Sequence, residues 1–289
     1  MKKIFKWLGF TFLALLLLVG IFYGVAYFST QSRINKVYNV TPQKLVIPTD
    51  SASYNRGKFL ASNRGCTGCH GADLSGFEVI LPENSPLGTL VARNITSGEG
   101  GIQFTDEDWI RLLRHGIDKE GKPVWFMPSD EVAHLSNRDM ADLICFLKQQ
   151  PPINHTVPVR KLKPLGRILV FLGQFPLLPA EIIDHKANYK DEIIATATPE
   201  YGAYLATSCS GCHAKNFKGA PSHTPEQPPI PNISSTGDLG KWSQTEFVTL
   251  MQTGKMPNGK QVSDAMPYKL FAYSDIELKA IYAYLHQLK

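Results

Sequence analysis

The distribution of apolar and polar residues divides the chain into an apolar start and a long globular remainder. Residues 7–28 contain no charged side chain, and at about 1.5 Å per residue a helix of this length crosses a hydrocarbon core of about 30 Å. Because Lys2, Lys3 and Lys6 precede this run, the positive-inside bias places the N-terminus in the cytoplasm and the rest of the chain across the membrane. A cleaved signal peptide is the alternative, but its apolar region usually has only about 7 to 15 residues. We expect an uncleaved transmembrane anchor within residues 1–33.

The apolar positions after this run follow helical spacing, and most of them belong to a pattern that occurs twice. The matched segments are GKFLAS (57–62) with GAYLAT (202–207), RNITS (93–97) with PNISS (231–235), FTDEDWIRLLRHG (104–116) with WSQTEFVTLMQTG (242–254), and SNRDMADLICFL (136–147) with SDIELKAIYAYL (274–285). Thr105, Ser136 and Ser274 stand at helix starts, each with an acidic residue three positions later. No run of alternating apolar and polar residues predicts a strand.

This repeat predicts an all-α fold in which two similar small domains follow the N-terminal helix. We expect the domains at 51–150 and 195–289, separated by a connector at 151–194. The length of 289 residues suits two domains, and 43% hydrophobic against 19% charged residues excludes a wholly disordered chain. The net charge of +5 is mild and gives no reason to expect a nucleic-acid partner.

Each predicted domain contains a candidate haem attachment motif, CTGCH in the first and CSGCH in the second. Two cysteines at this spacing can form thioethers to the vinyl groups of one haem, and the next residue supplies an imidazole to the iron. The candidate haem-binding residues are Cys66, Cys69, His70, Cys209, Cys212 and His213. His70 and His213 are thus expected to ligate iron in two covalently bound haem c groups.

A zinc half-site or a redox disulfide is the competing interpretation of a CxxC pair. Zinc sites built from such pairs usually take histidines at other spacings, whereas here the same histidine follows both pairs directly. The fifth cysteine, Cys145, lies among apolar positions with helical spacing and is expected to be a buried, inert thiol.

The distal iron ligand decides whether such a haem carries electrons or binds a substrate. A methionine thioether raises the reduction potential and leaves no vacant coordination position. Met127 and Met266 align with each other in the repeat, and each precedes a proline and the last predicted helix of its domain. We expect these two methionines as axial ligands. Met256 also precedes a proline, but it aligns with Asp118 and is the weaker candidate for the second haem.

The remaining candidates for a distal ligand are less favoured. Met140 and Met251 occupy apolar positions of predicted helices, where packing is the ordinary role. His115, His134 and His223 have no aligned histidine in the other domain, so we expect surface or helix-terminal roles for them. Ligation by two histidines would lower the potential, so this alternative stays open.

Matching asparagines and a basic connector complete the candidate chemistry. Asn94 and Asn232 occupy equivalent loop positions, where they could hydrogen-bond haem propionates or fix the turn of the loop. The connector contains an apolar stretch at 168–180 that is too short and too proline-rich to span a membrane. It could pack as a strap against the two domains, or the basic residues at 160–167 could hold it on anionic lipid or on another subunit.

With these motifs the chain resembles bacterial dihaem c-type cytochromes of the class I type, and especially the cytochrome c subunits of membrane-associated alcohol, aldehyde and sugar dehydrogenases. The motifs that carry the resemblance are CTGCH with Met127-Pro128, CSGCH with Met266-Pro267, the NIT and NIS loops, and the two closing helices. It covers residues 51–150 and 195–289. Those subunits commonly have three haem domains, whereas this chain has two and an N-terminal anchor.

The resemblance implies a tandem pair of class I cytochrome c domains in the periplasm, anchored in the bacterial inner membrane by one pass. It also implies electron transfer from a dehydrogenase to a quinone, cytochrome or oxidase acceptor in the respiratory chain. A dihaem peroxidase with one open iron is the alternative function, and matched Met-Pro loops argue against it. A haem-based gas or redox sensor is disfavoured because the two haem units leave no signalling domain.

Overall fold

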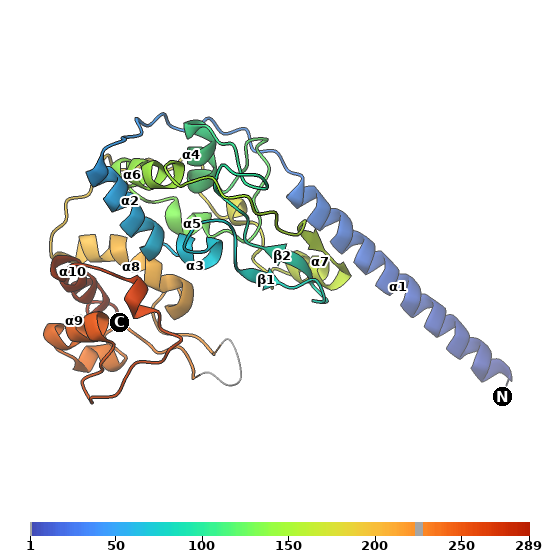
Figure 1. The fold of residues 1–289 in the computed structure, drawn as a ribbon. Helices are drawn as coiled ribbons and strands as arrows, with labels where there is room; N and C mark the ends of the chain where they lie inside the picture. The colour runs from blue at the N-terminus through green and yellow to red at the C-terminus, as the bar shows by residue number, and fades with distance from the viewer. Residues whose placement is uncertain (1, 223–227) are drawn as a thin grey trace. The chain divides into compact units, whose positions relative to one another are not determined.

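The computed structural model describes residues 2–222 and 228–289, and α-helices make up most of its regular structure (Figure 1). The helices are α1 (Lys2–Ile34), α2 (Ser51–Asn63), α3 (Cys66–His70), α4 (Asp106–His115), α5 (Ser129–Val132), α6 (Asn137–Lys148), α7 (Pro164–Phe171), α8 (Pro199–His213), α9 (Gln244–Thr253) and α10 (Asp275–Leu285). Short 3-10 turns are η1 (Pro179–Glu181), η2 (Asp238–Lys241) and η3 (Tyr268–Leu270). The expected dominance of helix is therefore confirmed.

The expectation that no strand would form was wrong. β1 (Val79–Leu81), β2 (Gly88–Val91) and β3 (Lys161–Leu162) form a small antiparallel sheet in the order β1-β2-β3. Runs of two to four residues are too short to show a period of two, so the pattern of the sequence did not reveal them. β3 belongs to the connector, and its pairing with β2 ties the connector to this sheet.

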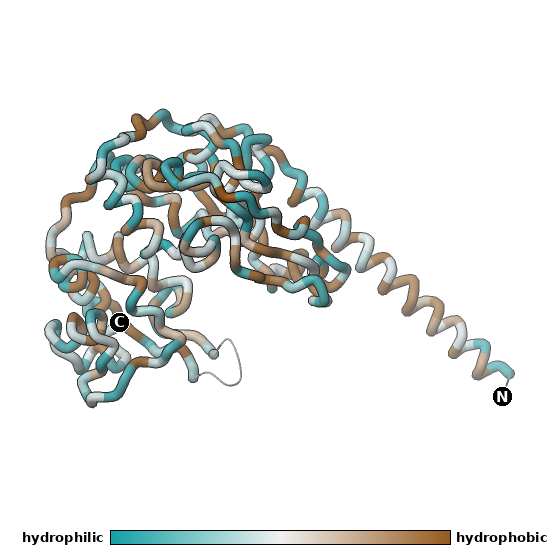
Figure 2. The backbone as a smooth tube through the Cα atoms, viewed as in Figure 1, coloured by the Kyte–Doolittle hydropathy of each residue, from teal (hydrophilic) through white to brown (hydrophobic). Residues whose placement is uncertain are grey.

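α1 is a single long helix that is hydrophobic over most of its length, apart from the lysines at its start (Figure 2). Among the residues that the structure describes, α1 alone is long and apolar enough to cross a membrane. Its C-terminal third differs, because Ala26, Thr30 and Ile34 are buried by packing within the protein. These residues lie three or four positions apart and so share one face.

Contacts between Cα atoms divide the chain into two compact units. The first unit contains residues 1–44, 69–133 and 150–187, and the second contains 45–68, 134–149 and 188–289. Within the segment at 51–150, residues 51–68 and 134–149, which contain α2 and α6 with its flanks, thus belong to the second unit, and residues 69–133 and 150 belong to the first.

Two helix pairs in the second unit cross at a glycine. α2 packs on α6 at Gly57, where an added Cβ would lie 1.9 Å from the carbonyl oxygen of Asp142. α8 packs on α10 in the same way at Gly202, 1.9 Å from the carbonyl oxygen of Ala280. Because any side chain would separate the backbones, the matched GKFLAS and GAYLAT segments need glycine at this position.

Arg56 joins these helices through a network of ion pairs and hydrogen bonds. Its guanidinium contacts Asp139 of α6 at 2.9 Å and Glu277 of α10 at 3.2 Å. Tyr204 and Tyr201 of α8 donate to the same two carboxylates, at 2.6 and 3.2 Å respectively. Carboxylates that are nearly buried, as both are here, need such partners to stay ionised.

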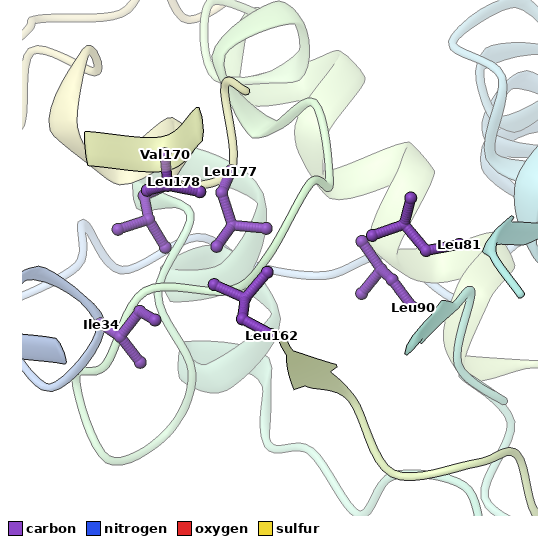
Figure 3. Packing of buried hydrophobic residues seen from close by; sticks show 7 residues of the cluster. All are labelled: Ile34, Leu81, Leu90, Leu162, Val170, Leu177 and Leu178. Atoms are coloured by element: carbon purple, nitrogen blue, oxygen red, sulfur yellow. The ribbon is translucent and has the colours of Figure 1, made fainter. Parts of the chain in front are cut away.

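A hydrophobic cluster holds the first unit together where α1, the sheet and the connector meet (Figure 3). Its buried members are Ile34, Leu81, Leu90, Leu162, Val170, Leu177 and Leu178. Apart from α1, the elements that supply these residues are short, so none of them could bury this surface alone. The connector is therefore a part of the core of this unit rather than a free linker.

Candidate haem-binding sites

Both haem attachment motifs are helical in the structure. The first forms α3, and the second forms the C-terminal end of α8. Residues three apart share a face of a helix, so each motif presents its two cysteines together, with the histidine directly after them. This arrangement suits attachment of both thiols to one haem.

The two motif histidines make the same hydrogen bond. Nδ1 of His70 lies 2.6 Å from the carbonyl oxygen of Arg93, and Nδ1 of His213 lies 2.8 Å from that of Pro231. Since a carbonyl can only accept, Nδ1 carries the proton and Nε2 keeps the lone pair that a metal needs. Burial lowers the pKa of both imidazoles, which favours the same neutral, ligating form.

The motif cysteines lack the properties of reactive or metal-bound thiols. Burial raises the pKa of Cys69, and it raises the pKa of Cys209 to about 12. A raised pKa keeps the thiol protonated, whereas redox-active cysteines need a lowered one. No group of three or more histidine, cysteine or acidic side chains within residues 2–222 and 228–289 is placed to hold a metal ion. Thioether attachment therefore stays the prediction for both motifs, and the protonated state of Cys69 and Cys209 is unlike that of a redox-active thiol.

The loops of Met127 and Met266 have the same backbone conformation. The amide of Ser129 donates to the carbonyl of Met127 at 2.7 Å, and that of Tyr268 donates to the carbonyl of Met266 at 2.8 Å. Each bond spans a proline. Pro128 has a φ of −76° and a ψ of 57°, and Pro267 has a φ of −82° and a ψ of 52°. These values describe an inverse γ-turn, which proline favours by fixing φ.

Met256 occupies a different kind of position. It forms a tight turn in which its amide donates to the carbonyl of Lys260 at 2.9 Å. Asp118 makes the equivalent bond to Lys122 at 2.8 Å in the first half. The structure therefore agrees with the alignment of Met256 with Asp118 rather than with Met127.

The remaining candidates have local partners. Met140 and Met251 are buried in α6 and α9. His115 is the last residue of α4, in agreement with the helix-terminal alternative; it is buried, and its Nδ1 lies 3.2 Å from Nδ1 of His185. The ring of His134 packs edge-on against Tyr204. His223 lies outside the described residues.

Asn94 and Asn232 fix the turns of their loops. The side-chain oxygen of Asn94 accepts from the amide of Thr96 at 2.9 Å, and that of Asn232 accepts from the amide of Ser234 at 2.8 Å. These Asx turns favour the loop-fixing interpretation over propionate binding. They follow directly after the carbonyls that orient His70 and His213.

His70 and Met127 lie in the first unit, and His213 and Met266 lie in the second. Each unit thus contains the motif histidine and the aligned Met-Pro methionine of one predicted site, which is the kind of donor pair that a six-coordinate haem c requires. The oriented imidazoles suit this cofactor, and the assignment of His70, Met127, His213 and Met266 as iron ligands stays a prediction.

The repeat gave no sign of Arg64, which lies two residues before the first motif. Its side chain is buried, Nη2 donates to the carbonyl of Tyr204 at 3.2 Å, and Nη1 is buried with no partner. Its charge opposes the burial effects that raise the pKa values of Cys209 and Tyr273. A buried cation therefore lies close to the second motif. Sequence patterns could not reveal it, because its contacts come from residues about 140 positions away.

Comparison with known proteins agrees with this site chemistry. Residues 200–289 match the cytochrome c family. This segment is thus similar to cytochrome c domains. The match confirms the resemblance drawn from the CSGCH motif and its Met-Pro loop.

Over more than four fifths of its length the chain is similar to curated cytochromes. It is 28% identical over 266 residues to the cytochrome c subunit of a quinone alcohol dehydrogenase from Gluconobacter oxydans, covering 83% of this chain and 55% of that protein. It is 25% identical over 280 residues to the cytochrome c subunit of a gluconate 2-dehydrogenase from Pantoea cypripedii, covering 83% and 60%. This chain thus spans little more than half the length of those two relatives.

A third relative is similar in length to this chain. A dihaem c-type cytochrome from Cereibacter sphaeroides is 28% identical over 265 residues, which is 81% of this chain and 85% of that protein. These relatives are cytochromes by name, as expected for a chain with c-type motifs.

Proposed function

We propose that the chain is a membrane-anchored dihaem cytochrome c, with two cytochrome c domains in tandem, that carries electrons and does not itself catalyse a substrate reaction. The observation that carries this proposal is the matched site geometry of the two halves. Each half combines an Nδ1-anchored histidine with a methionine in a proline-centred γ-turn. Two independent sites would not be expected to share both features.

A haem c at each motif would supply an iron that alternates between the ferric and ferrous states. The protein's residues determine how it does so. The carbonyls of Arg93 and Pro231 hold the imidazoles in one tautomer and orientation. Met127 and Met266 would occupy the remaining axial positions and exclude exogenous ligands. The buried charge of Arg64 would stabilise an added electron at the second site.

The donor is proposed to be a dehydrogenase, because two relatives are named as dehydrogenase cytochrome subunits. The acceptor would be a quinone, a cytochrome or an oxidase of the respiratory chain. α1 would anchor the chain in the bacterial inner membrane, with Lys2, Lys3 and Lys6 in the cytoplasm and both haem domains in the periplasm.

Carbon monoxide tests whether the irons are closed. We expect the spectrum of the dithionite-reduced protein to show two haems c per chain and to change little when carbon monoxide is added. Rapid stoichiometric binding would favour the peroxidase alternative, in which one iron is open. One haem per chain would contradict the tandem pair.

Substitution of methionines tests the assignment of the ligands. We expect Met266→Ala to lower one of the two reduction potentials by about 0.1 V or more and to open that haem to carbon monoxide. Met127→Ala should do the same to the other haem. Met256→Ala is the matched control, because it also removes a methionine before a proline. A changed potential in Met256→Ala with none in Met266→Ala would contradict the assignment.

A further inference from the structure

Helix α7 lies beside the C-terminal end of α1 in the first unit (Figure 1). The ring of Phe171, the last residue of α7, packs edge-on against Phe22 of α1 with 6.0 Å between centroids. Thr30 donates to the carbonyl of Arg167 at 3.1 Å, and Arg33 donates to that of Val170 at 2.9 Å. Packing and hydrogen bonds thus fix α7 along the last third of α1.

These contacts set the depth of α7, given the proposed membrane anchor on which this inference rests. Phe22 precedes Phe28, the last residue of the apolar stretch at 7–28, by six residues or about 9 Å along the helix axis. If the run fills the hydrocarbon core, Phe22 lies below the outer surface of that core. The ring of Phe171 contacts it, so this side chain reaches the same depth, while the backbone of α7 lies beside residues 30–33 of α1.

α7 has three faces, because successive residues of a helix are rotated by about 100°. Gly166 and Val170 are buried, and Val170 belongs to the cluster of Figure 3. Arg167 and Phe171 point toward α1. The third face carries four apolar residues at helical spacing, namely Leu165, Ile168, Leu169 and Leu172.

This third face has no protein cover at its two ends. Leu165 is 45% exposed and Leu172 is 51% exposed, while Ile168 and Leu169 between them are partly buried. An apolar stripe that is free of charge and held at the depth of hydrocarbon has lipid chains as its natural surroundings. We infer that α7 is a second membrane contact, whose leucine face lies among the acyl chains of the outer leaflet.

Three of the four basic residues at 160–167 already contact protein groups. Arg160 lies over the ring of Trp125 at 4.6 Å, and Arg167 lies over that of Tyr27 at 4.4 Å. The ammonium of Lys163 donates to two backbone carbonyls at 2.9 Å. Since protein groups already contact these three charges, attraction to anionic lipid is not the main contribution to the binding of α7 to the membrane. The contact should therefore form equally well with zwitterionic lipid.

Photolabelling of the native holoprotein tests this inference. The full chain is placed in phosphatidylcholine nanodiscs that contain a diazirine on an acyl chain, irradiated, and digested with trypsin. Three peptides are compared: 7–33 from α1, 168–186 from α7, and 270–279, which contains Ile276 at 51% exposure. We expect labelling of the first two at least about tenfold above the third. Added phosphatidylglycerol should change it by less than about twofold.

Two variants separate this contact from the anchor. Leu172→Asp should reduce labelling of 168–186 at least about fivefold and leave that of 7–33 unchanged, because a charge is excluded from hydrocarbon. Ile276→Asp should change neither. Labelling of 7–33 with 168–186 at the level of 270–279 would overturn the inference and leave the anchor intact. An absence of label on 7–33 would contradict the anchor itself, and strong dependence on anionic lipid would overturn the apolar contact.

Discussion

The two methionine loops share a backbone conformation but differ in what surrounds them. Next to Met127, the amide of Phe126 donates to the carbonyl of Leu177 at 2.7 Å, and its ring packs on Phe175 at 5.6 Å. Both partners belong to the connector. The loop of Met266 instead bonds within itself, through the carbonyl of Ser263 at 2.8 Å.

The asparagine loops differ in the same way. The side-chain amide of Asn94 donates to the carbonyls of Ile153 and His155 in the connector, at 2.7 and 3.2 Å. The side-chain amide of Asn232 donates to the hydroxyl of Thr236, four residues away, at 3.0 Å. The connector thus braces both loops of the first site, while the side chain of Asn232 and the amide of Met266 bond within their own loops. Equal ligand sets can therefore differ in rigidity, which affects how easily a ligand is displaced.

Substitution of the glycines at the two helix crossings tests a feature that the two halves share, and we expect it to cause the largest loss of stability. Gly57→Ala and Gly202→Ala should each destabilise the protein by about 3 kcal/mol, because the new methyl group would overlap a backbone carbonyl. Thermal unfolding of the haem-loaded protein measures this. Gly20→Ala in α1 is the control, since an added Cβ there meets nothing within 4 Å. A fully stable Gly202→Ala would show that the second crossing is loose.

The asparagines test the difference between the loops. Asn94→Ala removes bonds from a fully buried side chain and should cost about 2 to 3 kcal/mol, because its carbonyl partners stay buried. Asn232→Ala should cost about 1 kcal/mol, since water can replace its partner. Urea unfolding gives both values. Equal losses would mean that the connector does not stabilise the first loop.

Local signals made the helices and the motif geometry predictable. Thr105 and Ser274 form the predicted capping boxes, and Ser136 caps α6. Alignment of the halves also selected Met127 and Met266, whose turns match. Such features depend on residues close in sequence, so a local pattern is enough to reveal them.

Long-range contacts were not predictable in this way. The connector offered a choice between a strap and a docking segment, and its role in bracing Phe126 depends on Leu177, 51 positions later. Arg56 and Arg64 found their partners across even larger separations. No periodicity encodes which distant segment covers a loop, so only the folded structure shows the asymmetry between the sites.

Removal of one connector side chain tests the brace directly. Phe175→Ala removes the ring contact to Phe126 and should speed displacement of Met127 by imidazole about tenfold, equivalent to 1.4 kcal/mol. Stopped-flow absorbance of the ferric protein resolves the two haems, and the second should be unaffected. Val159→Ala alters an 87% exposed residue of the same connector and serves as the control. If both haems respond alike, the brace is not specific to the first site.

The smallest expected effect is a dependence of stability on pH. It arises in the first half alone, because the residue of the second half that aligns with His115 is Thr253, which does not titrate. Nε2 of His185 donates to the carbonyl of Ala180 at 3.0 Å, so its Nδ1 accepts from His115. Burial, and then the nearby His185, lower the pKa of His115 to about 4.

In the unfolded chain His115 becomes protonated near pH 6.5, whereas in the folded protein it does so only near pH 4. Between these two pH values the unfolded chain therefore binds more protons than the folded one. Stability should therefore be complete above pH 6.5 and decline below it. Replacement by His115→Gln should reduce the loss between pH 7 and 5 by on the order of 1 kcal/mol, measured by urea unfolding at each pH. Thr253→Val should leave the pH profile unchanged. A profile that His115→Gln does not flatten would place the titrating group elsewhere.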